Sequence, residues 1–192
     1  MAVDTFESPL AASDRWRGFV AAHPWGSAAI AGLVGTQMAT LVGYYFIGVG
    51  LPQLPWPLYN GVLVIFNKDF SEFATASTYF AGQSIHMVDG VVFTILYAAT
   101  LYGRFPGPDS PTGDLIKGLT FSVILGLISM GFLVPYVYAP KTGLGLFSFE
   151  GPDTWKLPLA ILVWHLAYGF FLGQLYSPAR RRAAAAADTA TA

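Results

Sequence analysis

STYFAGQSIHMVDGVVFTILYAATLYGR, residues 77–104, is long and apolar enough to cross a lipid bilayer as one helix. It nevertheless carries His86 and Asp89, and a spacing of three residues places two side chains near one face of a helix. Ionisable groups are costly in hydrocarbon, and those found in membrane spans usually face the interior of a bundle. We therefore expect His86 and Asp89 to point inward and to form part of a candidate site.

A second apolar stretch, residues 157–176, repeats the pattern H-x3-G-x6-Y of the first. At about 100° per residue, offsets of four and eleven return to within roughly 40° of the starting direction. Each predicted helix therefore carries one stripe of histidine, glycine and tyrosine. The two stripes are His86, Gly90 and Tyr97, and His165, Gly169 and Tyr176.

The composition of the whole chain is typical of an integral membrane protein. Of its 192 residues, 54% are apolar and 11% are charged, whereas a soluble domain has about 25% charged residues. Apolar runs of about 20 residues predict four spans, at 27–50, 78–102, 115–136 and 157–176. We expect an all-α integral membrane protein with four transmembrane helices in a bundle, built as two repeated helical hairpins.

The absence of cysteine and a net charge of −1 exclude several classes of protein. Without cysteine the chain cannot form a disulfide, a thiolate metal site, an iron–sulfur cluster or a covalent c-type haem. The charge balance gives no indication of nucleic-acid binding. The chain also contains no P-loop, no dinucleotide fingerprint and no nucleophile elbow.

The distribution of basic residues predicts that both termini lie on the cytoplasmic side of the membrane, because positive residues near span ends are held there. The first 25 residues lack the basic start of a cleavable signal peptide, so we expect the first span to be retained. The chain then divides into a tail at 1–26, a membrane domain at 27–176 and a basic, Ala-rich tail at 177–192. Seven basic residues fall on the predicted inner side and three on the outer side: Arg15, Arg17, Arg104, Lys117, Arg180, Arg181 and Arg182, against Lys68, Lys141 and Lys156.

The connection at 51–77 is too apolar for a plain loop. It holds three prolines, Trp56 and an apolar-leaning run at 58–66 that is too short to span. We expect an interfacial or re-entrant segment in this first outer loop.

The remaining patterns predict how the helices pack. Small residues four apart in the first span, at Ala31 and Gly35 and at Ala39 and Gly43, predict tight packing against a neighbour. The short proline- and glycine-rich turn after Arg104 predicts that the second and third helices form an antiparallel pair. The third helix is expected to end at Pro135.

The segments GLVGTQMATLVG, SIHMVDGVVFTILYA and VWHLAYGFFLGQLY resemble a family of small four-span bacterial inner-membrane proteins described as a domain of unknown function. The resemblance extends from about Ala31 to Tyr176. It implies a four-helix architecture with histidines retained in the spans, and it implies no activity.

The first functional hypothesis is a non-catalytic accessory or structural subunit of a larger membrane complex. Its partners would be the bilayer and other membrane-protein subunits or a second copy of the chain. Aromatic residues make up 16% of the sequence, and such residues are favoured both at protein interfaces and in membrane belts. In this hypothesis the glycines permit close helix packing, and the histidines hydrogen-bond across it.

The second hypothesis is a cofactor site. A b-type haem could take His86 and His165 as axial ligands, with Gly90 and Gly169 leaving room for the flat ring. Alternatively, His86, Asp89 and His165 could form the two-histidine, one-carboxylate set that binds non-haem iron or zinc.

The third hypothesis is a proton or solute path. Intramembrane carboxylates mark such paths, and Asp89 is the candidate, with Gln37 and Gln83 as lesser polar groups.

Overall fold

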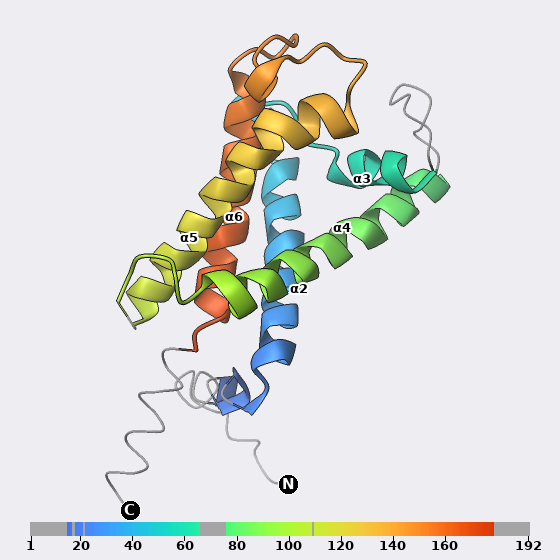
Figure 1. Ribbon diagram of the computed structural model, residues 1–192. Helices are drawn as coiled ribbons and strands as arrows, with labels where there is room; N and C mark the ends of the chain where they lie inside the picture. Colours follow the sequence, from blue (N-terminus) through green and yellow to red (C-terminus); the bar gives the residue numbers. More distant parts are fainter. Residues whose placement is uncertain (1–14, 17, 21, 66–75, 109, 179–192) are drawn as a thin grey trace, which may run out of the picture.

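The computed structural model describes residues 15–16, 18–20, 22–65, 76–108 and 110–178, and in these ranges the chain is helical without a strand. Four of the described helices are long and apolar enough to cross a membrane (Figure 1), which confirms the predicted all-α membrane class. The predicted tails fall outside the described residues over 1–14 and 179–192, and the first connection does so over 66–75. The spans are Pro24–Tyr44, Ala76–Leu101, Pro111–Tyr138 and Lys156–Leu175.

Each span begins within about one turn of its predicted start. The first is α2 (Pro24–Tyr44), which is followed by the 3₁₀ turn η1 (Phe46–Val49). The second is α4 (Ala76–Leu96), continued by the π-helical η3 (Tyr97–Leu101), and the third is α5 (Pro111–Ile128), continued by the π-helical η4 (Ser129–Tyr138). The fourth is α6 (Lys156–Leu175). Two short helices lie in the connections: α3 (Trp56–Ile65) and η5 (Leu146–Ser148).

The third span continues past Pro135, where the sequence predicted its end. Proline has no N–H and normally breaks an α-helix. In η4 the helix widens, and the Ala139 N–H donates to the Val134 carbonyl five residues earlier, at 3.0 Å. The wider turn accommodates Pro135 inside the helix. The span therefore reaches Tyr138.

The helices pack as the two predicted hairpins. α2 packs against α4, α5 packs against α6, and α2 also packs against α6. The small residues predicted on the first span, Ala31, Gly35, Ala39 and Gly43, are all buried. Because lipid provides no hydrophobic drive between helices, this close approach of small side chains supplies the dispersion contacts that hold the hairpins together.

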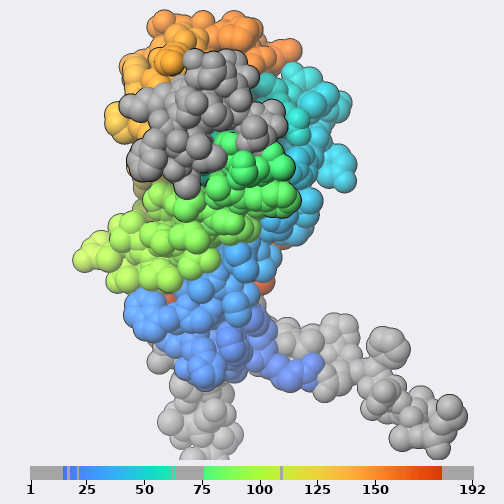
Figure 2. Space-filling view, turned by 90° about the vertical axis from the view of Figure 1, so that its right-hand side faces the viewer, coloured from blue at the N-terminus to red at the C-terminus, as the bar shows by residue number. Residues whose placement is uncertain are grey.

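The expected antiparallel pair of the second and third helices is not packed along its length. α4 packs on α2 and α3 and crosses the bundle obliquely, whereas α5 packs on α6 (Figure 1). The reason lies in the glycines within the helices, because Gly82 and Gly90 of α4 contact α3 and α2, whereas Gly118 and Gly126 of α5 contact α6. Figure 2 shows α4 lying across the outside of the molecule. The separation of α4 from α5 leaves space for a pocket.

Candidate functional site

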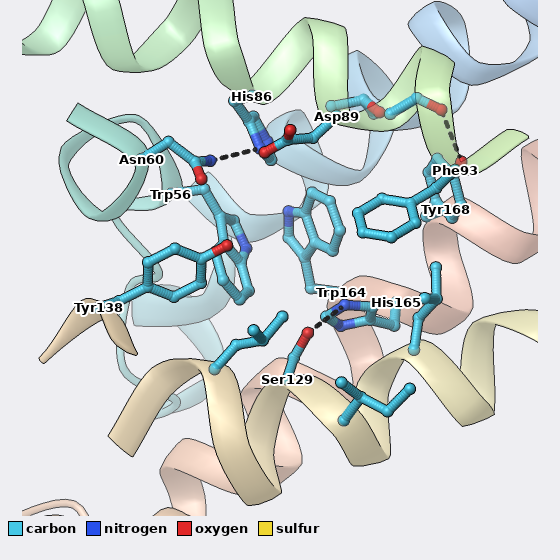
Figure 3. Close-up of a pocket in the computed structure, with 15 residues that line it drawn as sticks. Trp56, Asn60, His86, Asp89, Phe93, Ser129, Tyr138, Trp164, His165 and Tyr168 are labelled. Carbon is cyan, nitrogen blue, oxygen red and sulfur yellow. Dashed lines mark hydrogen bonds between the residues drawn. The ribbon is translucent and has the colours of Figure 1, made fainter. Parts of the chain in front are cut away.

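A pocket of about 120 Å³ lies between the helices, near α3 (Figure 3). Both predicted histidines and Asp89 line it. The lining residues contributed by α2, α3 and α6 are buried, whereas Asp89 and Phe93 of α4 and Ile128 of α5 are partly or well exposed. The pocket therefore opens sideways between α4 and α5, in the direction that faces hydrocarbon when the four helices span a membrane.

The short helix α3 forms one wall of this pocket. It is ten residues long, about 15 Å at 1.5 Å per residue, and so is too short to span a bilayer. Gly82 of α4 touches the backbone of α3 at Pro57, where an added Cβ would overlap the Pro57 carbonyl. This contact lets α3 place Trp56 and Asn60 beside the histidines, with both side chains buried.

His86 is held by hydrogen bonds at both ring nitrogens, and its side chain is 5% exposed. The Asn60 amide donates to Nδ1 at 3.2 Å. Nε2 therefore carries the hydrogen and donates to the Thr40 hydroxyl at 3.1 Å. Thr40 in turn donates to the Thr36 carbonyl at 2.8 Å. His86 thus connects α4 to both α2 and α3.

His165 is held in the opposite tautomer and is also 5% exposed. Its Nδ1 donates to the Ile161 carbonyl one turn earlier in α6, at 2.7 Å. Nε2 is then an acceptor, and the Ser129 hydroxyl donates to it at 3.0 Å. Ser129 is the first residue of η4, so this bond connects α6 to the start of the widened helix.

The residues present do not fit a haem held between the two histidines. An axial ligand needs a free ring nitrogen aimed at the iron, and all four ring nitrogens of His86 and His165 already have protein partners. The space between the imidazoles is also filled. Trp164 has its ring centroid 5.4 Å from that of His86 and 5.0 Å from that of His165, and Trp56 contacts both histidines as well.

Gly90 and Gly169 lie at helix contacts, which is one of the two roles expected for them. A Cβ on Gly90 would overlap Thr36 of α2, and a Cβ on Gly169 would overlap Ser122 of α5. The space above each glycine is therefore occupied by a neighbouring helix. The two histidine–glycine–tyrosine stripes are buried throughout, so each stripe does face the interior.

The predicted metal set is not assembled in this structure. Among the described residues, no group of three or more His, Asp or Glu side chains lies close enough to hold a metal ion. His86 and His165 share the pocket, but their nitrogens point to Asn60, Thr40, Ser129 and a backbone carbonyl rather than to a common centre.

The pocket contains buried polar atoms without a hydrogen-bond partner among the described residues. Four side chains contribute such an atom: Trp56 through Nε1, Trp164 through Nε1, Asn60 through Oδ1 and Thr36 through Oγ1. Each of these side chains is at most 6% exposed. Native proteins pair nearly all buried polar groups, so a concentration of unpaired ones at a single cavity indicates a site that is completed by something else.

Asp89 adds a carboxylate to these groups. It lines the pocket and is half-buried, and no hydrogen bond or ion pair joins it to a described residue. Figure 3 shows its carboxylate beside His86, above the two indole rings. The predicted polar groups Gln37 and Gln83 are not among the residues that line the pocket.

Sequence reasoning missed most of the aromatic wall. Trp56, Phe93, Tyr138, Trp164 and Tyr168 all line the pocket. Trp164 directly precedes His165, and Tyr168 follows it by three residues, so helical spacing alone could have grouped them with the stripe. Trp56 and Tyr138 gave no such signal, because their positions depend on the fold of α3 and on the widened turn in η4.

No family model, no curated protein and no solved structure matches this chain. Its resemblance to a four-span family stays a prediction, and its function has to be argued from the pocket.

Proposed function

We propose that this multi-pass membrane protein binds a small organic molecule in the pocket between α4 and α5, and that the pocket is the binding site of a solute path through Asp89. One observation carries the proposal. Four buried side chains with polar atoms that have no partner among the described residues, together with a carboxylate that has none there either, line a single cavity. The four atoms expose almost no surface to the cavity, so Trp56 and Trp164 could donate to a ligand, and Asn60 could accept from it, after a small movement of these side chains, whereas Asp89 is partly exposed as it stands.

The energetic cost of this arrangement supports a ligand. Each buried polar group left unpaired costs about 1–3 kcal/mol. Water could pair such groups in a soluble protein, but this pocket opens toward hydrocarbon, where water is scarce. A ligand that carries both an acceptor and a donor would recover the cost.

The size of the pocket limits the ligand. The cavity measures about 120 Å³, and an engineered cavity of about 150 Å³ is known to bind benzene. A molecule of about benzene's size, roughly six non-hydrogen atoms, is therefore the largest that the enclosed part would hold, and a slightly larger one would extend into the open side. The sideways opening favours entry from within the bilayer.

The proposal includes the location of the protein. We place it in a bacterial inner membrane with both termini cytoplasmic, supported by the seven-to-three division of basic residues. The first residue of α2 and the last of α6 lie toward the same end of the bundle (Figure 1), as an even number of spans requires. An accessory role in a larger complex stays a prediction, because a helix face that contacts lipid and one that contacts a partner have the same apolar surface.

An occluded variant tests ligand binding. Leu133 lines the pocket from η4 and makes no side-chain hydrogen bond, so Leu133→Trp should fill the cavity without removing a polar partner. The thermal stability of the wild type and of this variant, both in maltoside detergent, would be measured against a library of small cations, anions and neutral molecules. We expect at least one class to stabilise the wild type and not the occluded protein. A library that shifts neither protein, or both equally, would refute the proposed function.

A further inference from the structure

We propose that the ligand of this pocket is a small organic cation, held by its charged nitrogen against Asp89 and the surrounding aromatic rings. This inference rests on the proposed function and names the chemical class of the ligand. It depends on the sign of the charge in the pocket and on the aromatic rings that line it, in addition to the unpaired polar groups that support the proposed function.

The formal charge that the described lining residues contribute to the pocket is negative. Among the described residues that line it, Asp89 is the formally charged one, and neither Lys nor Arg is present. A carboxylate in a membrane span costs about 2.5–3.5 kcal/mol on insertion scales and normally has a partner. Asp89 has none among the described residues, so a cationic ligand would supply the missing partner. An anion would be repelled by Asp89 and by the unpaired Asn60 oxygen.

The aromatic rings suit the same kind of ligand. Five lining residues present aromatic rings to the cavity: Trp56, Phe93, Tyr138, Trp164 and Tyr168. Ring faces attract a cation within about 6 Å, most strongly when the cation is desolvated, and cages of this type recognise quaternary ammonium groups. The two tryptophans contact each other, with ring centroids 5.3 Å apart, and each stacks on a further ring of the lining, Trp56 on His86 and Trp164 on Tyr168.

The two indole N–H groups add a requirement for an acceptor. Trp56 Nε1 and Trp164 Nε1 are buried and unpaired, and an indole can only donate. These nitrogens expose almost no surface to the cavity, so a cation that also carries a hydroxyl or carbonyl oxygen would pair with them after a small turn of the indole rings, while its nitrogen faces Asp89. Choline has this chemistry within about the permitted number of atoms, and it is the probe of choice. The same headgroup is present in choline-headed lipids, which could reach the sideways opening from the bilayer.

The test compares choline with 3,3-dimethyl-1-butanol, its uncharged isostere, by calorimetric titration of the protein in maltoside detergent. We expect choline to bind the wild type at least about tenfold more tightly than the isostere, since the difference between them is the cation. Asp89→Asn should lose that preference. The matched control is Glu150→Gln, which removes one negative charge from the exposed loop outside the pocket.

A second variant tests the same inference in case Asp89→Asn does not fold. Phe93→Leu keeps an apolar side chain on α4 and removes one ring, so choline binding should weaken while isostere binding changes little.

Nanodiscs of phosphatidylcholine and of phosphatidylglycerol separate the two sources of the ligand. If added choline binds more weakly in the phosphatidylcholine nanodiscs than in the phosphatidylglycerol nanodiscs, the lipid headgroup competes for the pocket and is the natural ligand. If choline binds equally well in both, the ligand is a free cation. Either result supports the inference.

Three outcomes would overturn the inference, and they differ in what they mean for the proposed function. If the isostere binds as tightly as choline and Leu133→Trp abolishes both, the pocket binds neutral molecules and the proposed function stands. If choline binds Asp89→Asn as well as it binds the wild type, the cation does not pair with Asp89. If neither probe binds and the wider library also fails, the proposed function falls with the inference.

Discussion

Two intramembrane carboxylates, Asp89 and Asp114, lie in opposite surroundings. Asp114, in the first turn of α5, is 0% exposed and accepts hydrogen bonds from the hydroxyls of Tyr102 and Ser177. The ammonium of Lys117 lies 4.3 Å from the centre of the Tyr102 ring in the same cluster. Asp89 is half-buried, faces a cavity and has no such partner among the described residues. A carboxylate that is fully satisfied by its own chain stabilises the fold, whereas one left unsatisfied beside a cavity is available to a ligand.

The largest effect is expected from removing each carboxylate in turn. Asp114→Ala removes the hydrogen bonds that the Tyr102 and Ser177 hydroxyls donate to the carboxylate, and at about 1–3 kcal/mol for each of the two it should lower the free energy of unfolding by roughly 2–6 kcal/mol. Asp89→Ala should change the free energy of unfolding by less than about 1 kcal/mol, or raise it, because an unpaired charge is removed. Reversible unfolding in mixed detergent would measure both. Equal losses would show that Asp89 has a structural partner of its own.

A smaller difference is expected between the two helix-contact glycines. In Gly169→Ala the new Cβ would lie 2.6 Å from the Gly118 carbonyl as well as against Ser122, and backbone cannot rotate away. In Gly90→Ala the overlap is with the Thr36 hydroxyl, which has no bond to lose among the described residues, and with the Thr36 Cβ at 2.9 Å, while the nearest backbone atom, the Gly32 carbonyl oxygen, lies 3.2 Å away. Overpacking costs about 1–3 kcal/mol. We expect Gly169→Ala to reach that range and Gly90→Ala to cost less, as measured by thermal unfolding. The reverse order would mean that the end of the bundle near the pocket is the more rigid one.

The last prediction concerns which end of the bundle faces which compartment. It involves no expected change in stability. Reporter fusions in the connections at 51–77 and 139–156 should report the outer compartment, because the basic residues are concentrated on the other side. The pocket would then lie toward the outside and Asp114 toward the cytoplasm. A cytoplasmic signal from either fusion would reverse the placement of the two carboxylates.

The fold was largely predictable, because span length and hydropathy depend on composition over about 20 residues. His86, Asp89 and His165 could be placed at one pocket from their spacing and from the cost of exposing them to lipid. The partners that hold the histidines could not, since Asn60 and Ser129 are common residues that become informative only when α3 and η4 have folded.

The two hairpins were predicted, but the separation of α4 from α5 was beyond the sequence. The turn after Arg104 is short enough to suggest that α4 and α5 pack together, yet glycines on different faces direct them to different neighbours. Asp114 was missed for a related reason. In the sequence Asp114 looks like an ordinary acidic residue in the first turn of a helix. Its burial depends on Tyr102 and on Ser177, which is 63 positions further along the chain.

The widened turn in η4 has a consequence for how this pocket could change in evolution. A ring closed by an i→i+5 bond holds one residue more than an α-helical ring, so deleting one residue between 129 and 134 would return the segment to ordinary α geometry. The residue that closed the wider ring would then close an α-helical ring, so the helix beyond the deletion would keep both its direction and its facing. Tyr138 would keep its place in the cavity wall. A residue gained or lost elsewhere in this span would instead turn every later side chain by about 100°, so the widened turn is the place where the length of the helix can change while the pocket keeps its lining.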